Sequence, residues 1–250
     1  MDNAINTTDK LHQRIACNEA GSVSFHDFVL GLLDPRADDA ALDIGAGLGQ
    51  QLVPVAARVR RAVGVEVSAE IAATLRAQLR RPDARVVLGD MDRLAELDLG
   101  APFTLAYSVY SLYYSADVPR LVRAVAGLLE GPHARFVVVA PDAGSNATWF
   151  GDLSQLYEIP AEVLGSPNLC RGVMLPAFLD VFPRVDCARF QTEVRFRHVD
   201  ELMRYYDACA PYCRADRRAE AREHFARKLD REGEYQIVKR SLGLVGHAGA

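Results

Sequence analysis

The stretch Ala41–Gln50, ALDIGAGLGQ, places three glycines within five residues, directly after an apolar run that carries one carboxylate, Asp43. Glycine adopts positive φ without strain and lets a ligand approach the backbone closely. A tight turn without a ligand is the alternative, but Gly45, Gly47 and Gly49 are more glycines than one turn requires. The stretch therefore predicts a buried strand that ends in a binding loop for a small molecule.

Composition limits the classes of protein that fit. The chain has 250 residues, half of them hydrophobic, and a net charge of −4. The sequence has no basic block of the kind that binds a phosphate backbone, so we do not expect nucleic acid as the main partner. The N-terminus MDNAINTTDKLHQR lacks the apolar region of a secretory signal, and no run of about 18 apolar residues predicts a membrane span. The five cysteines are odd in number and scattered, which favours a cytoplasmic protein with reduced thiols and no metal site.

Apolar runs alternate with helical patterns over residues 38–141. We expect strands at 40–45, 61–67, 84–90, 103–109 and 134–141, and their continuous apolar character favours a parallel sheet covered on both faces. One expected helix carries Ile71, Leu75 and Leu79, with Ser68 as its N-cap. Another spans about 118–129, with Asp117 at its start and Gly131 at its stop. This rhythm predicts a doubly wound α/β fold.

The pattern changes after residue 141. Residues 142–184 indicate loops and helices, 185–196 a strand, 197–233 two helices, and 234–246 a last strand. We interpret residues 1–250 as a single domain with an N-terminal helical lid (1–37) and a cofactor-binding core (38–141). Residues 142–184 and 197–233 form the expected cap on the substrate side.

The glycine pattern distinguishes between nucleotides. A dinucleotide loop reads G-x-G-x-x-G, whereas here Gln50 stands where the third glycine is required. With Asp43 inside the strand, the stretch resembles the first motif of class I S-adenosylmethionine-dependent methyltransferases, hydrophobic-Leu-Asp-hydrophobic-Gly-x-Gly-x-Gly. The alternative interpretation, an NAD-dependent dehydrogenase, holds only if this loop binds a pyrophosphate.

Three further segments resemble the same family in the correct order: GVEVS (64–68), LGDMDRL (88–94) and SVYSLYYSADV (108–118). The resemblance implies a seven-stranded, mostly parallel sheet and S-adenosyl-L-methionine as cofactor. It implies that Glu66 accepts the ribose hydroxyls, that Asp90 accepts the adenine amino group, and that Met91 contacts the ring. The implied cofactor-binding residues are Asp43, Gly45, Ala46, Gly47, Gly49, Glu66, Val67, Asp90, Met91, Ser108 and Val109.

Two positions depart from the family pattern. Thr104 stands where an acidic residue often precedes the fourth strand, and GPH (131–133) replaces a Gly-Gly turn before the fifth. The helices expected between the last two strands are similar to those of the trans-aconitate and juvenile hormone acid methyltransferase groups. This likeness implies a cap and a small-molecule acceptor, in keeping with biosynthesis.

The resemblance implies methyl transfer by in-line displacement at the sulfonium methyl, without a metal. The protein then aligns the acceptor and excludes water, and a base is needed only for a protonated acceptor. Candidate catalytic residues are Tyr113, Tyr114 and His198. Candidate substrate-binding residues are His26, Tyr110, Trp149, Phe150, Tyr205 and Tyr206, although the last four also suit packing.

Two other functions stay open at this point. One is a non-catalytic protein that binds the cofactor and serves as a regulator or partner. The other is methylation of a protein or RNA, although the Asn-Pro-Pro-aromatic tetrad of nucleic-acid amino methylases does not occur. The sequence leaves open the acceptor, the choice among O-, N- and C-methylation, and whether the chain forms a homodimer.

Overall fold

The structure, a computed structural model, describes residues 8–19, 21–209 and 212–249. The chain forms two compact units. The sheet unit comprises His26–Asp142, Asn168–Phe190 and Ser241–Ala250. The helical unit comprises Met1–Phe25, Ala143–Pro167 and Gln191–Arg240. The first seven residues of the predicted lid lie outside the described residues, and the interpretation as a single domain stays a prediction.

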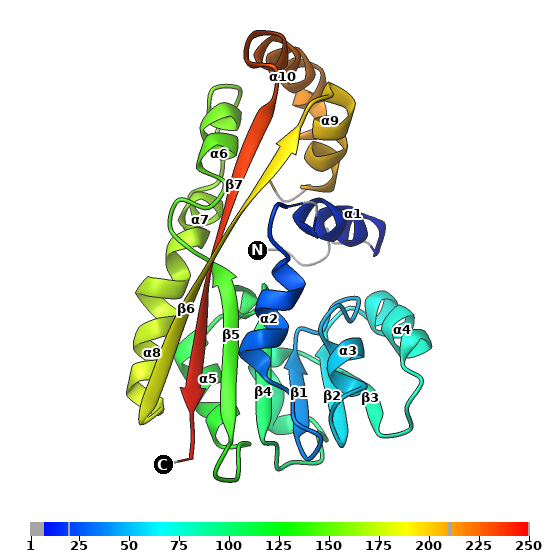
Figure 1. The fold of residues 1–250 in the computed structure, drawn as a ribbon, viewed down its shortest axis with the longest axis vertical. Coiled ribbons are helices and arrows are strands. Elements are labelled where there is room, and N and C mark those ends of the chain that lie inside the picture. The colour runs from blue at the N-terminus through cyan, green and yellow to red at the C-terminus, as the bar shows by residue number, and fades with distance from the viewer. Residues whose placement is uncertain (1–7, 20, 210–211, 250) are drawn as a thin grey trace. The chain divides into compact units, whose positions relative to one another are not determined.

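The strands form one seven-stranded sheet in the order β3-β2-β1-β4-β5-β7-β6 (Figure 1). β1 to β5 run parallel to one another, and β7 runs antiparallel to β5. This topology confirms the predicted doubly wound, mostly parallel sheet. The strands are β1 (Ala40–Ile44), β2 (Arg61–Glu66), β3 (Ala84–Leu88), β4 (Leu105–Val109), β5 (Arg135–Pro141), β6 (Arg184–Phe196) and β7 (Tyr235–His247).

The helices of the sheet unit connect and cover these strands. α5, α8 and the π-helical turn η5 share an apolar core with the central strands, while α3 and α4 pack against β1 to β3. These elements are α2 (Phe25–Leu33), α3 (Leu52–Ala56), α4 (Ala69–Gln78), η2 (Met91–Glu96), η3 (Leu112–Tyr114), α5 (Val118–Ala126), η5 (Cys170–Met174) and α8 (Leu175–Val181).

Local signals set the helix boundaries. The Ser68 hydroxyl accepts the Ile71 amide at 3.4 Å and caps α4, as predicted. Asp117 caps α5 by accepting the Arg120 amide at 2.9 Å. The expected stop of α5 near Gly131 is wrong, since the helix ends at Ala126. Backbone hydrogen bonds joining Phe103 to Leu128 and Glu130 draw the chain away from the helix axis.

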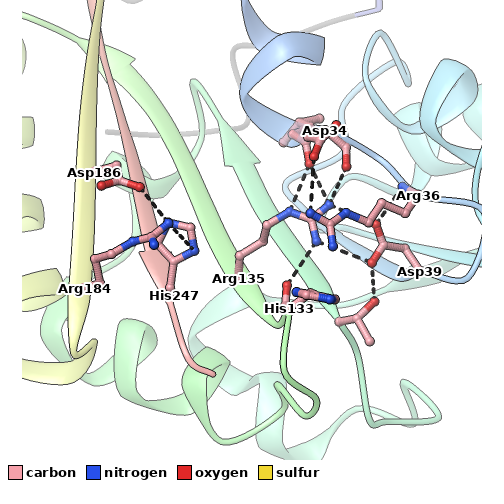
Figure 2. A network of polar contacts seen from close by, with 10 residues as sticks. Asp34, Arg36, Asp39, His133, Arg135, Arg184, Asp186 and His247 are labelled. Carbon is pink, nitrogen blue, oxygen red and sulfur yellow. Dashed lines mark hydrogen bonds and ion pairs between the residues drawn. The ribbon is translucent and has the colours of Figure 1, made fainter. Parts of the chain in front are cut away.

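A buried ion pair fastens the amino ends of the strands (Figure 2). The Arg135 guanidinium lies 2.9 Å from the Asp39 carboxylate, and the two side chains are only 6% and 3% exposed. Arg135 also donates to the carbonyls of Leu33 and Asp34 at 2.7–3.1 Å. Thr104, which departs from the family pattern, donates to Asp39 at 2.6 Å and accepts the Ala40 amide at 3.1 Å. It therefore joins β1 to β4 as part of this network.

The helical unit has its own core, built from aromatic residues of α6, α9, α10 and the adjoining parts of β6 and β7. A carboxylate, Asp152, is buried there and accepts hydrogen bonds from Lys228, His224 and Tyr235 at 2.6–3.1 Å. The predicted helical insertion between the last two strands is confirmed by α9, η6 and α10. The elements are α1 (Thr8–Glu19), α6 (Ala147–Ser154), α7 (Ala161–Gly165), η4 (Ser166–Asn168), α9 (Val199–Ala208), η6 (Ala215–Arg217) and α10 (Arg218–Glu232).

Within the described ranges, no helix is both long enough and apolar enough to cross a membrane.

Candidate cofactor and acceptor site

The carboxyl ends of the parallel strands form the candidate site. In an open parallel sheet, ligands bind outside this edge. Backbone hydrogen bonds connect the loops. The Gly45 and Ala46 amides donate to the Val65 carbonyl, both at 2.9 Å, and the Gly89 amide donates to the backbone carbonyl of Glu66 at 3.0 Å. The segments that resemble the family's motifs therefore meet at one edge of the sheet.

The glycine loop after β1 needs its glycines for two reasons. Gly45, Gly47 and Gly49 have φ values of +77°, +54° and +85°, a region that other residues rarely adopt. A Cβ at Gly45 would lie 2.5 Å from the Ser111 side chain, and one at Gly49 would lie 2.3 Å from Leu75. The loop thus combines left-handed backbone with close contact to neighbouring elements.

Glu66 ends β2 beside this loop and is only 7% exposed. One carboxylate oxygen accepts the Gly47 amide at 3.0 Å, and the other accepts the Ser68 amide at 2.8 Å. A carboxylate has about four acceptor positions, so two remain for a ligand. Glu66 is held in a fixed orientation with acceptor capacity for a pair of hydroxyls.

Asp43 lies inside β1, opposite Gly64 of β2 and Tyr107 of β4. Burial raises the pKa of Asp43 to about 8; the neighbouring Glu66 carboxylate adds to this rise, and the Tyr107 hydroxyl opposes it. Asp43 is 3% exposed. It therefore tends to hold its proton near neutral pH in the ligand-free protein.

The segment after β3 adds apolar and acidic groups. Asp90 is exposed, and its carboxylate accepts the Asp92 amide at 2.9 Å. Val67 and Leu88 at the ends of β2 and β3 are 48% and 47% exposed. Exposed aliphatic groups beside carboxylates suit a ring with apolar faces and polar edges, such as a purine.

The end of β4 has an unusual backbone. Ser108 is fully buried and Val109 is half-buried. Tyr110 follows with φ +55°, rare for an aromatic residue, while its amide donates to the Val139 carbonyl at 2.8 Å. Its hydroxyl lies 2.8 Å from the Ser241 hydroxyl, and burial raises the pKa of Tyr110 to about 12. This strained residue directs the following turn, η3.

Tyr113 and Tyr114 occupy η3 with ring centroids 4.7 Å apart, and both are half-buried. The same turn is joined to η2, because the Asp92 carboxylate accepts the Ser115 hydroxyl and, at 2.8 Å, the Ala116 amide. His26 lies half-buried in α2 of the same unit. The roles of these three candidates toward an acceptor stay predictions.

The other acceptor-side candidates lie in the helical unit. Trp149 is fully buried and stacks on Phe225 with centroids 5.1 Å apart; Tyr205 packs against its edge. Phe150 and Tyr206 are also buried. These contacts fit the packing alternative. His198 is exposed at the start of α9 and makes no capping hydrogen bond.

Sequence reasoning missed the contribution of Ser111, whose hydroxyl donates to the Ile44 carbonyl at the end of β1 at 2.6 Å. It also missed Asp92 as the link between η2 and the turn after β4. Neither residue belongs to a glycine or strand-end pattern, and their partners are distant in sequence. Only the paired ends of the strands bring these groups together.

The residues at this edge fit S-adenosylmethionine. The left-handed glycine loop leaves no room for a Cβ at two positions, the oriented Glu66 can accept a ribose diol, and exposed Asp90 can accept an amino group. The predicted cofactor set from β1 to β4 lies wholly within the sheet unit. Each residue's contact with the cofactor stays a prediction.

Comparisons with known proteins agree with this geometry. Residues 41–131 match the family described as "Methyltransferase domain". The ribosomal RNA small subunit methyltransferase A of Methylibium petroleiphilum is 28% identical over 182 residues, which are 65% of this chain and 69% of that protein.

Two solved structures show the same fold. The YcgJ protein of Bacillus subtilis superposes with a TM-score of 0.60 at 16% identity, covering 90% of this chain and 98% of that chain. A geranyl diphosphate methyltransferase in complex with GPP and sinefungin superposes with a TM-score of 0.51 at 19% identity. The superposition covers 89% of this chain and 76% of that chain.

Proposed function

Since the chain belongs to the class I S-adenosylmethionine-dependent methyltransferases, we propose that it methylates a small-molecule acceptor at the carboxyl edge of the sheet. The match of residues 41–131 to a methyltransferase domain supports methyl transfer, and the residues at this edge fit S-adenosylmethionine as the donor. The acceptor class is our proposal, and it rests on the segment that follows β4.

That segment, Tyr110–Tyr114, carries the argument. Nucleic-acid amino methylases use an Asn-Pro-Pro-aromatic tetrad, and residues 108–114 instead read SVYSLYY. Its two half-buried phenols, Tyr113 and Tyr114, offer apolar faces and a hydrogen-bonding tip, which suits a compact acceptor of mixed polarity. The net charge of −4 also disfavours a polyanionic substrate.

The proposed cofactor contacts follow from the site. Glu66 accepts the ribose hydroxyls, Asp90 accepts the adenine amino group, and Val67 and Met91 pack on the ring. Because the glycine loop lacks side chains at these positions, the rest of the cofactor can approach its backbone closely. When bound, the cofactor supplies a methyl group on a sulfonium centre, which is already activated for displacement.

The protein's own share of catalysis is then alignment and exclusion of water. Tyr113 and Tyr114 would orient the acceptor, and either hydroxyl can relay a proton to solvent if the acceptor is protonated.

A second candidate function is RNA methylation, which one observation favours: the named relative is a ribosomal RNA methyltransferase. At 28% identity, this likeness fits a shared methyl-transfer reaction and leaves the acceptor class to the test below. The two functions make different predictions about where the transferred methyl group is found.

The test is a labelling experiment with methyl-tritiated S-adenosylmethionine and a cell extract from which the endogenous cofactor has been removed. After the reaction, the extract is separated by ultrafiltration, and the retained fraction is treated with nuclease or protease. Label in a filtrate compound that chromatography separates from S-adenosylmethionine, and that requires intact Tyr113 and Tyr114, supports the proposal. Label retained in RNA and released by nuclease would overturn the acceptor class.

A further inference from the structure

The turn after β4 and the glycine loop after β1 interlock through Ser111, a buried residue that the implied set of cofactor-binding residues does not include. Ser111 is 8% exposed. Its hydroxyl donates to the Ile44 carbonyl at 2.6 Å, one residue before Gly45. A single hydroxyl has one hydrogen, so the 2.6 Å contact between Ser108 and Ser111 has Ser108 as the donor.

This produces a directed chain of hydrogen bonds from Ser108 to Ser111 to the end of β1. All three groups are buried, where an unpaired polar group is costly and a satisfied network is rigid. The chain links the strand end that carries two predicted cofactor residues, Ser108 and Val109, to the glycine loop that carries four others.

The contact is also steric. A Cβ placed on Gly45 would lie 2.5 Å from both the Cβ and the Oγ of Ser111, below any normal separation. The Ser111 side chain therefore occupies the space beside Gly45 and leaves room only for a residue without a side chain. The Met91 methyl would lie 3.6 Å from the same Cβ, so η2 contacts this position too.

The backbone directs Ser111 to this place. Two hydrogen bonds hold Tyr110 at its strained φ of +55°. Its backbone amide donates to the Val139 carbonyl, and its hydroxyl is hydrogen-bonded to the Ser241 hydroxyl. Backbone strain of this kind persists only where its surroundings impose it, and it is concentrated at functional sites. Here it turns the chain so that the next side chain points back to β1.

We propose that Ser111 is a positioning residue that fixes the conformation of the glycine loop for S-adenosylmethionine binding. It acts on the cofactor through Ile44 and Gly45, without touching the acceptor. The inference rests on the chain's use of this cofactor and is independent of the acceptor class.

The experiment compares Ser111→Ala with wild type in the 250-residue chain. Affinity for S-adenosylhomocysteine is measured by calorimetry, and hydrogen–deuterium exchange of a peptide covering 44–50 is measured without ligand. We expect Ser111→Ala to weaken binding about tenfold, since two buried partners lose a hydrogen bond, and to speed exchange in the loop. The matched control is Ser166→Ala, which removes a hydroxyl hydrogen bond to the Val163 carbonyl at 2.8 Å in the helical unit and should alter neither readout.

A steric test complements the first. Gly45→Ala is measured in wild type and in a Ser111→Gly background. The strain of an alanine at φ +77° is present in both, so it cancels. If Ser111 fills this space, Gly45→Ala should cost at least about tenfold more affinity in wild type than in the Ser111→Gly protein.

The outcomes separate clearly. Loop exchange and affinity in Ser111→Ala that match wild type would overturn the proposal, even if the melting temperature falls, because a merely structural role moves only stability. Should Ser111→Ala fail to fold, Ser111→Cys keeps the shape with a weaker donor and is measured in the same way. Neither assay contains an acceptor, so a failure of the small-molecule assignment leaves this result intact.

Discussion

Replacing Arg135 by methionine should destabilise the sheet unit by about 3–5 kcal/mol, the usual cost of removing one partner from a buried ion pair. Asp39, only 3% exposed, would lose its counter-charge, and the carbonyls of Leu33 and Asp34 would lose their donors. Burial alone would raise the pKa of Asp39, but hydrogen bonds from Arg135 and Thr104 hold it below its usual value.

Urea unfolding followed by circular dichroism measures the loss. With m-values of about 1–3 kcal/mol/M, the midpoint should fall by about 1 M or more. The control is Arg184→Met, since Arg184 and Asp186 in Figure 2 are 66% and 58% exposed, and exposed pairs contribute about 0–1 kcal/mol. If Arg135→Met costs no more than Arg184→Met, the argument from burial is wrong.

A double variant tests the cause of the loss. Removing the stranded charge as well, in Arg135→Met with Asp39→Asn, should recover part of the stability. The pH dependence has a definite sign. A carboxyl with a lowered folded pKa stabilises the protein above its unfolded pKa, and this contribution is lost as the pH falls. The free energy of unfolding of Arg135→Met should therefore fall by less than that of wild type as the pH is lowered into the acid range.

Further predictions concern four positions. Glu66→Ala should weaken S-adenosylhomocysteine binding by about 10- to 100-fold, the value of hydrogen bonds to a charged group, and unchanged calorimetry would contradict its assignment. Burial raises the pKa of Asp43 to about 8, so the folded protein holds a proton that the unfolded chain releases. Stability of the ligand-free protein should thus decline from about pH 4 to about pH 8 through this group, and Asp43→Asn should flatten the decline in melting temperature. Asp152→Ala should cost about 3–5 kcal/mol, because buried Tyr235 and half-buried Lys228 and His224 lose their acceptor, whereas a loss below about 1 kcal/mol in urea titration would show the network to be dispensable. Gly49→Ala, with φ +85° and a Cβ 2.3 Å from Leu75, should lose about 1–3 kcal/mol, and an unchanged midpoint would rule out strain there.

Continuous apolar strands made the sheet predictable, because parallel strands are buried on both faces and leave a plain signal in the sequence. Ser68 and Asp117 were predicted as helix caps for an equally local reason. The end of α5 was misplaced because Phe103, far away in sequence, pairs with Leu128 and Glu130.

The candidate site divides in the same way. The glycines and Glu66 stand next to strand ends, where residue type and spacing are informative. Ser111 and Asp92 act through partners 67 and 23–24 residues away, and such contacts depend on strand order. The aromatic residues Trp149 and Tyr205 suit a ligand or a core equally well by composition, and only their burial separates the two.

The position of Trp149 has a spectroscopic consequence. It is the single tryptophan of the chain, and it lies fully buried against Phe225 in the helical unit. Its fluorescence is therefore a natural optical label for that unit, while circular dichroism registers both. Melting curves that coincide would mark one cooperative transition, and curves that separate would show that the two units unfold in separate steps.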